Sequence, residues 1–418
     1  MNIHPATING MQENGRKRVT PRGLNGGASP ARALPATDLR SRIDKVAAVA
    51  AAHAIAVDRE SRFPHEAIAA ARAERLLSIA VPRELGGEGL STADVVDVCY
   101  ALGKACASTA MIYAMHQTKV ACLVRHGRGS AWHQLLLRRL CAEQLLLASS
   151  TTEGQAGGDV RNSAAPVEGG AARITLERQA TVISYGEAAD GIVTTARRAA
   201  DAASSDQVLV AFLKDDYRLE RLNGWDALGM RGTCSAGFKL VATGLREQIL
   251  PEAYEKIHSH TMMPFAHLAW SGAWAGIAAA AVDRARSFVR KAAHRSGGTL
   301  PPAAAHLTRA LASLRTLRSL IAAALERFEA ADAETLESID FQTGMNMHKV
   351  NASELAVTTV MSAMQACGLA GYRNDGDFTM GRHLRDVLSA PIMISNDRIL
   401  ANVAAASLLA GTPASLRD

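Results

Sequence analysis

The chain has 418 residues, more than one hydrophobic core usually supports, so we expect two or three structural units that bury one another. Hydrophobic residues make up 48% of the sequence but aromatic residues only 4%, which favours helices packed through small side chains over a large β-sandwich. The formal net charge is +6, yet the Arg residues are interleaved with Asp and Glu and form no long basic run. The charge therefore indicates a solvated surface and excludes nucleic acid as the expected partner.

The N-terminal end predicts a disordered tail. Residues 1–36 mix Gly, Pro, Asn and Arg without periodicity, and such a composition buries too little apolar surface to order itself. The basic residues Arg16, Lys17 and Arg18 have no apolar run behind them. We also find no stretch of the roughly eighteen apolar residues that span a bilayer, so we expect a soluble, cytoplasmic protein without membrane contact.

Helical periodicity begins after the tail and lasts for about one hundred residues. Residues 37–148 are predicted as an N-terminal helical domain, because their apolar residues recur at helical spacing. The segment 82–89 (PRELGGEG) interrupts this pattern with a Pro and a Gly pair, and it predicts a loop between helices.

The sequence pattern changes near Ser149, where short runs of β-branched and apolar residues replace the helical periodicity. Three of them, 180–184 (ATVIS), 191–195 (GIVTT) and 207–213 (QVLVAFL), are separated by clusters of Gly, Asp and Ser. We predict that residues 149–250 form a central β domain.

Helical periodicity returns after Pro251 and predicts a C-terminal helical domain over residues 251–418. Four long Ala- and Leu-rich segments predict a helical bundle: 266–293, 302–331, 340–367 and 396–409. No Gly-rich phosphate loop follows a predicted strand. A nucleotide cofactor would therefore bind between the domains, where ligand sites often form.

The six cysteines lie far apart in the sequence and do not form a C-x-x-C pair or a His-containing metal motif. They are Cys99, Cys106, Cys122, Cys141, Cys234 and Cys367. We expect reduced, mostly buried thiols and no metal site.

Several short motifs occur in a characteristic order. In chain order they are FPxEA from Phe63, VPxELGG from Val81, TExxAGGD from Thr152, GMRGTxS from Gly229, QACGxxGY from Gln365 and the pair Arg385-Asp386. Each is short enough to recur by chance, but in this order and at these separations they resemble the acyl-CoA dehydrogenase family over nearly everything after the tail. The resemblance implies a mostly α fold with a β insert: an N-terminal helical domain, a central β-barrel-like domain and a C-terminal four-helix bundle.

The resemblance implies a flavin between the domains, with FAD expected. Isoalloxazine rings are tuned by hydrogen bonds to N5 and to the carbonyl oxygens. By the motif match, Thr151 and Thr152 would contact the pyrimidine side of the ring, and Ser184 takes the place of the Thr beside N5. The same match adds Val182 to the ring contacts, with the AGGD glycines Gly157 and Gly158.

The adenosine half of the cofactor is held partly across a subunit interface in the family. Gln365 and Gly368 would meet the pyrophosphate through side-chain and backbone donors. The match also assigns Arg295, Asn396 and Arg398 to this half, while Leu369 replaces the second glycine of the family motif. A homodimer or homotetramer is therefore expected.

The sequence departs from the family where the family carries its catalytic carboxylate. The usual Glu lies eight residues after the Asp of the Arg-Asp pair, which is Ile394 in this chain. The alternative family position falls on Ala266, and the CoA-anchoring Arg that follows it is His267. The Ser of the family AGSD motif, which helps to hold pantetheine, is Gly158. The last two departures, His267 and Gly158, make CoA itself a doubtful carrier, because the loss of Arg removes a fixed charge and a bidentate donor.

Three other residues have a chemical interpretation and a structural one. His267 would act as a base or a proton donor if it faces the flavin, but a lone His on an apolar helix is more often a core residue. His116 has the same two interpretations. Asp397 follows Ser395 and Asn396 at a helix start, where capping or adenine contact is favoured over catalysis.

The resemblance implies an FAD-dependent oxidoreductase that oxidises an acyl thioester at Cα–Cβ, with the acyl group on CoA or on a carrier protein. The alternative is a monooxygenase of the same fold that uses reduced flavin and O₂ and needs no carboxylate base. A third alternative is a flavin-binding protein without turnover. The partners implied are a small acyl substrate and either an electron acceptor or a flavin reductase.

Overall fold

The computed structural model describes residues 38–153 and 160–408, so the predicted tail 1–36 lies outside the described residues. The first described unit is helical, as the periodicity predicts. Its helices are α1 (Leu39–Glu60), α2 (His65–Ala73), α3 (Thr92–Ala105), α4 (Ala107–His126) and α5 (Ala131–Glu143). The predicted loop 82–89 contains one short 3₁₀ turn, Arg83–Leu85, and follows another at Leu76–Ser78.

The central unit consists of two small sheets. The first has the order β1-β4-β5, with β1 parallel to β4, and the second is antiparallel with the order β2-β3-β7-β6. The strands are β1 (Leu147–Ser150), β2 (Glu168–Gly169), β3 (Arg173–Ile183), β4 (Gly191–Arg197), β5 (Gln207–Leu213), β6 (Tyr217–Arg221) and β7 (Ala236–Leu245). The three predicted runs therefore correspond to β3, β4 and β5, although β3 begins seven residues earlier than predicted.

The C-terminal unit contains the four predicted long segments. They are α7 (Met263–Arg295), α8 (Ala304–Ala330), α10 (Ile339–Cys367) and α13 (Asn396–Ser407). Shorter helices lie before and between them: α6 (Tyr254–Ile257), a π-helical turn (His258–Met262), α9 (Ala333–Glu337), α11 (Leu369–Tyr372) and α12 (Gly381–Val387).

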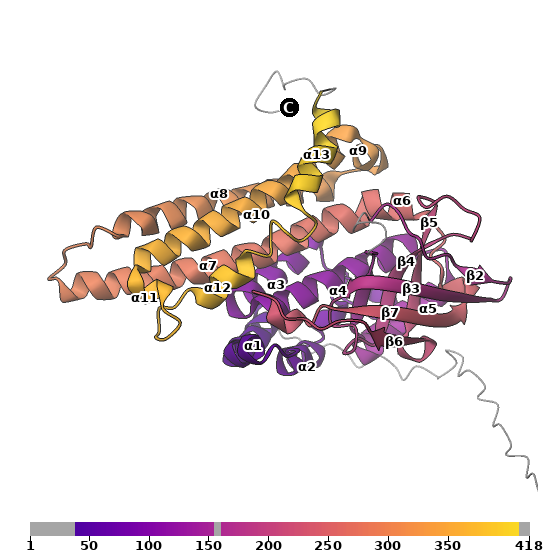
Figure 1. Cartoon of the computed structure of the whole chain (residues 1–418), viewed down its shortest axis with the longest axis horizontal. Helices are drawn as coiled ribbons and strands as arrows, with labels where there is room; N and C mark the ends of the chain where they lie inside the picture. Colours follow the sequence, from indigo (N-terminus) through magenta and orange to yellow (C-terminus); the bar gives the residue numbers. More distant parts are fainter. Residues whose placement is uncertain (1–37, 154–159, 409–418) are drawn as a thin grey trace, which may run out of the picture.

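Helix α7 is the central element of the molecule. It packs against α3 and α4 of the N-terminal unit and against α8 and α10 of its own unit, and most of its residues are buried. Figure 1 shows α7, α8 and α10 side by side along the long axis, with the two sheets toward one end. Helix α13 packs on α10 through Ile399 and Val403, which contact Val350. The predicted mostly α fold with a β insert is confirmed.

One continuous helical stretch differs from the sequence prediction that no segment is apolar enough to span a membrane. Among the described residues, Tyr254–Arg295 is long and apolar enough by length and composition alone. However, 89% of its most apolar window is buried inside the protein. This burial is the pattern of a core helix, and the tertiary contacts of α7 explain its composition.

Helices α3 and α7 approach each other closely because a glycine stands on each side of their contact. A Cβ on Gly103 would lie 2.3 Å from the Ala273 carbonyl oxygen, and a Cβ on Gly276 would lie 2.2 Å from that of Tyr100. Both distances are shorter than any real Cβ contact, so the two backbones meet at a point where side chains do not fit.

We expect Gly276→Ala to lower the free energy of unfolding by about 1–3 kcal/mol, because the added methyl group must push α3 and α7 apart. Chemical denaturation measures this difference. Gly129→Ala is the matched control, since a Cβ there would meet nothing within 4 Å. Equal stability of the two variants would contradict the close approach of the helices.

Candidate functional site

The ends of β1 and β3 lie together at one edge of the central unit. Glu153 forms an isolated antiparallel bridge with Ala180, so Thr151 and Thr152 run alongside Val182. The side chains of Thr151, Thr152, Val182 and Ser184 are all half-buried. The structure thus brings together the residues that the resemblance assigns to the flavin ring, except Gly157 and Gly158, which lie outside the described residues.

A chain of hydroxyl groups runs inward from Ser184. Its Oγ lies 2.8 Å from Ser235 Oγ, which lies 2.7 Å from Thr233 Oγ1. Thr233 Oγ1 donates to the Met230 carbonyl oxygen at 2.8 Å. Because a hydroxyl has one hydrogen, this last bond sets the direction of the others: Ser235 donates to Thr233, and Ser184 donates to Ser235. Ser184 therefore offers an acceptor lone pair to any further partner.

An ion pair is buried directly behind this edge. Arg178 Nη1 lies 3.3 Å from Glu153 Oε1, and the two side chains are 0% and 4% exposed. Glu153 also accepts hydrogen bonds from Ser163 Oγ at 2.8 Å and Ala164 N at 2.6 Å. Burial lowers the pKa of Arg178 to about 10, which leaves it charged at neutral pH. The pair joins the strand that carries Thr151 and Thr152 to β3.

The GMRGTxS turn of the central unit contacts the Arg385-Asp386 pair of the C-terminal unit. Asp386 Oδ1 accepts a hydrogen bond from Met230 N at 2.7 Å, and Arg385 Nη1 donates to Asp58 Oδ1 at 3.0 Å. A Cβ on Gly229 would lie 2.0 Å from the Arg385 carbonyl oxygen, so only glycine allows this approach. Burial raises the pKa of Asp386 to about 6. Two motifs that are remote in sequence thus form one joint.

The linker between α12 and α13 contains Ile394, the residue at the usual carboxylate position. Its φ is +48°, a left-handed conformation that β-branched residues rarely adopt. The Ile394 carbonyl oxygen accepts a hydrogen bond from Lys349 Nζ at 2.7 Å. The sequence analysis does not single out Lys349. Its helical spacing from Met345 and Ala352, which are buried residues of α10, indicates that its side chain faces the interior.

Asn396 has internal partners rather than a free amide. Its Oδ1 accepts from Lys349 Nζ at 2.7 Å, and its Nδ2 donates to Ser353 Oγ at 3.0 Å. The side chain of Asn396 thus links α13 to α10, and its contact with a cofactor stays a prediction. Ser395 is the residue that caps α13, while Asp397 and Arg398 in the first turn are exposed.

Both histidines considered in the sequence are buried and bonded to main-chain atoms. His267 Nδ1 lies 3.1 Å from the Met345 carbonyl oxygen, and burial lowers its pKa to about 3. Such a group is a weak base, so the structural interpretation of His267 is favoured over the catalytic one. His116 has Nε2 at 2.8 Å from the Leu77 carbonyl oxygen and accepts from Leu147 N through Nδ1 at 3.0 Å. It joins α4 to β1.

The residues assigned to the adenosine half lie elsewhere. Gln365, Gly368 and Arg295 are exposed, and a Cβ on Gly368 would meet nothing within 4 Å. Figure 1 shows α11, which follows Gly368, at the same end of the bundle as the connection from α7 to α8, while the sheets lie toward the opposite end. A single chain therefore does not bring these three residues to Thr151 and Ser184.

Comparison with known families shows what kind of protein has this fold and these motifs. Residues 37–143 match the family model described as "Acyl-CoA dehydrogenase, N-terminal domain", and residues 260–409 match "Acyl-CoA dehydrogenase, C-terminal domain". The chain belongs to the acyl-CoA dehydrogenase family. The two models flank the β domain, so the helix, β, helix order of the family is complete in this member.

Relatives and solved structures of the family fold have several activities. L-evernosamine nitrososynthase from a Micromonospora species is 28% identical over 363 residues, which cover 80% of this chain and 81% of that protein. TdsC from Paenibacillus sp. A11-2, a dibenzothiophene monooxygenase solved with FMN, has a TM-score of 0.75 at 18% identity, with 89% and 98% of the chains covered. Butyryl-CoA dehydrogenase from Megasphaera elsdenii has a TM-score of 0.71 at 18% identity, with 90% and 100% covered. The structural likeness supports the fold.

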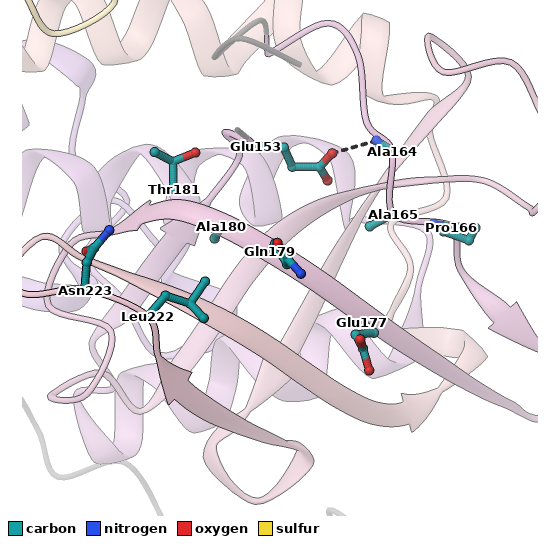
Figure 2. Close-up of a pocket in the computed structure, with 10 residues that line it drawn as sticks. All are labelled: Glu153, Ala164, Ala165, Pro166, Glu177, Gln179, Ala180, Thr181, Leu222 and Asn223. Atoms are coloured by element: carbon teal, nitrogen blue, oxygen red, sulfur yellow. Dashed lines mark hydrogen bonds between the residues drawn. The ribbon is translucent and has the colours of Figure 1, made fainter. Parts of the chain in front are cut away.

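This family member has a pocket of about 440 Å³ beside the β1–β3 edge. Figure 2 shows its lining over the outer face of β3, with the Glu153 carboxylate bonded to the Ala164 main chain. Glu177 and Asn223 on its wall are also bonded, to Lys239 at 2.7 Å and to Gly237 N at 2.6 Å. A second pocket of about 330 Å³ lies among α3, α4, α7 and α8 and includes Arg125, Phe265 and Glu329.

The six cysteines are unpaired, as predicted, and five of them are buried while Cys234 is half-buried. Within residues 38–153 and 160–408, no group of three or more His, Cys, Asp or Glu side chains is arranged to hold a metal ion.

Proposed function

We propose that the chain is a flavin-dependent monooxygenase that uses reduced flavin and O₂. The observation that carries this proposal is the absence of a carboxylate at both positions where the family places its base. Ile394 packs against the cluster of Val350, Ile399 and Val403, and Ala266 is buried in α7. His267 does not replace the base, since its pKa is about 3. Removal of a proton from Cα of a thioester therefore has no suitable acceptor at these positions.

The β1–β3 edge fits a flavin ring. Thr151, Thr152 and Ser184 are half-buried hydroxyl residues on two neighbouring segments, and Val182 is a half-buried apolar residue between them. When bound, the flavin would supply the redox chemistry, while these residues would hold and orient its ring. The hydroxyl chain behind Ser184 leaves that residue as an acceptor. An acceptor suits a ring nitrogen that carries hydrogen, as N5 does in reduced flavin.

Two of the proteins that the chain resembles support this proposal. A relative that matches 80% of the chain is named L-evernosamine nitrososynthase, and TdsC is described as a dibenzothiophene monooxygenase. By analogy, the substrate of this chain is a small molecule with an oxidisable nitrogen or sulfur atom. In such a reaction one atom of O₂ enters the substrate and the other leaves as water, with two electrons supplied by a separate flavin reductase.

FAD remains the predicted cofactor, with Gln365 and Gly368 contacting its pyrophosphate from a second copy of the chain. This arrangement requires a homodimer or a homotetramer. It is supported by the exposure of Gly368, Leu369 and Tyr372 at one end of the bundle. FMN, as bound by TdsC, would not need these residues.

Acyl-thioester oxidation is the second candidate function. It is favoured by the family models and by the fold match to butyryl-CoA dehydrogenase. In that case the substrate would be CoA- or carrier-tethered, and an electron acceptor would replace the reductase. In acyl-thioester oxidation the substrate reduces the oxidised flavin. In the monooxygenase reaction a reductase supplies reduced flavin, which then reacts with O₂.

Two assays of the holoprotein separate these functions. In the first, oxidised holoprotein is mixed anaerobically with acyl-CoA thioesters of several chain lengths, and we expect the visible flavin band to remain. In the second, NADH, a flavin reductase and isotopically labelled O₂ are added with amino sugars and aromatic sulfur heterocycles. We expect one labelled oxygen atom in a product. Bleaching by a thioester would overturn the monooxygenase proposal in favour of the dehydrogenase.

A further inference from the structure

Lys349 is a charged side chain at the centre of the C-terminal unit. It lies in the middle of α10 and is 0% exposed. Burial lowers its pKa to about 8, against the smaller opposite effect of Glu354 on its own helix. A buried ammonium group without a carboxylate partner needs other oxygen atoms around it.

Those oxygen atoms come from the end of the linker between α12 and α13 and from the first residue of α13. Lys349 Nζ donates to the Ile394 carbonyl oxygen and to Asn396 Oδ1, both at 2.7 Å. The ammonium group also lies 5.8 Å from the centre of the Trp274 ring on α7, within the range of a cation–π contact. Lys349 therefore joins α10, α7 and the linker.

The linker needs such a bond because of its conformation. Ile394 is in the left-handed region, where a β-branched side chain is strained, and such a conformation persists only when the surrounding structure holds it. Its side chain packs toward α13 through Ile399 and Val403, while its carbonyl group points to Lys349. The side chain and the carbonyl group are thus held from two directions.

The other end of the linker is held as well. Asp386 in α12 accepts from Met230 N, and Met230 accepts from Thr233, which belongs to the hydroxyl chain that ends at Ser184. The linker therefore follows directly on a residue that is hydrogen-bonded to Met230, and it is bonded to Lys349 near its other end. Without Lys349, the Ile394 carbonyl oxygen would lose this bond, and the apolar packing of Ile394 on Ile399 and Val403 would remain.

We propose that Lys349 is a positioning residue that holds the linker 388–395 in place through the Ile394 carbonyl oxygen, and that this linker supports the α12 contact with Met230, from which hydrogen bonds lead to Ser184. The inference rests on the proposed function only in naming flavin as the ligand of the edge that carries Ser184. Lys349 touches neither substrate nor cofactor in this proposal. It acts through the linker conformation.

The test labels the linker directly. Ile392 is 75% exposed, so Ile392→Cys carries a thiol-reactive fluorophore whose anisotropy reports linker order, with the unsubstituted chain as background for the native cysteines. We expect Lys349→Met to lower the anisotropy of this label and to weaken flavin binding at least tenfold. Lys349→Arg, which retains a cation and its donors, should restore most of both. Unchanged anisotropy and flavin affinity in Lys349→Met would overturn the proposal.

Lys119→Met is the matched control. Lys119 is also buried in a helix, with its Nζ 3.4 Å from the Met262 sulfur, so its bond is to the start of the C-terminal unit and not to the linker. The Lys119→Met variant should leave the anisotropy of the label at the wild-type value. An equal decrease of anisotropy in Lys119→Met and Lys349→Met would contradict a specific role for Lys349.

If Lys349→Met fails to fold, Lys349→Gln provides a second variant, because its amide is a neutral donor that removes the charge from this position. Linker anisotropy equal to wild type in Lys349→Gln and flavin affinity equal to wild type would together overturn the proposal. A wild-type protein that binds no flavin would refute the proposed function, while the anisotropy would still decide the role of Lys349.

Discussion

Replacing Glu153 by leucine is expected to lower the free energy of unfolding by about 3–5 kcal/mol, because it leaves a buried cation without its counter-charge. Arg178 is fully buried, and its Nε and Nη2 atoms have no hydrogen-bond partner among the described residues. Its Nη1 bonds to Thr195 do not neutralise the charge. Ser163 Oγ and Ala164 N would also lose their acceptor. Chemical denaturation of the purified variant measures the loss.

Two further variants separate charge burial from general damage to β3. Glu177→Leu removes an exposed ion pair with Lys239 on the outer face of the same strand, and it should cost no more than about 1 kcal/mol. The double variant Glu153→Leu/Arg178→Met removes both buried charges and should recover most of the stability. A double variant as unstable as Glu153→Leu would show that the packing of Glu153, not its charge, matters.

Acidification should destabilise the protein between about pH 6.5 and pH 4 through its buried neutral histidines. Burial lowers the pKa of His116 to about 4, from an ordinary value of 6.5. In this pH window the unfolded chain binds a proton that the folded chain does not bind, so stability falls as pH falls. The difference of about 2.5 units corresponds to about 3 kcal/mol for His116 alone. His348 and His267, with pKa values of about 4 and about 3, act in the same direction.

The measurement is the free energy of unfolding as a function of pH in wild type and in His116→Gln. Glutamine can donate to the Leu77 carbonyl oxygen and accept from Leu147 N, but it does not titrate. The variant should therefore show a slope shallower by about 1.4 kcal/mol per pH unit in the window. Identical slopes for His116→Gln and wild type would refute the role of His116.

The sequence predicted the elements whose residues carry their own periodicity. The segment 266–293 corresponds to α7 within three residues at each end, because its apolar residues recur without interruption. The run 207–213 is β5, in which six of the seven residues are buried. Strands β6 and β7 were not among the three runs named, since YRLER is polar and AGFKLVATGL contains two glycines. Their pairing with each other and with β3 determines their conformation.

The resemblance predicts Thr151, Thr152, Val182 and Ser184 as flavin contacts from matched motifs alone. The structure places the two segments that carry these residues next to each other, at the bridge between Glu153 and Ala180. The direction of the Ser184 hydrogen bond depends on Ser235, 51 residues away, which no local pattern reveals.

The burial of two basic residues was likewise not predicted from the sequence. Arg178 occupies an inward position in the alternation of β3, between Leu176 and Ala180, and Lys349 lies on the buried stripe of α10. A basic residue is usually interpreted as part of a solvated face, but these two positions indicated the interior.

The joint between α12 and the GMRGTxS turn has a consequence for synthesis of the chain. Asp58, near the end of the first helix, pairs with Arg385, which the ribosome adds 327 residues later. The Met230 amide bonds to Asp386, which follows it by 156 residues. Contacts of such long sequence separation form slowly, and during translation the apolar helix α7 emerges before α8 and α10 can cover it. The nascent protein thus passes through a long interval with its most apolar helix incompletely covered, in which chaperone binding to α7 would favour correct assembly over aggregation.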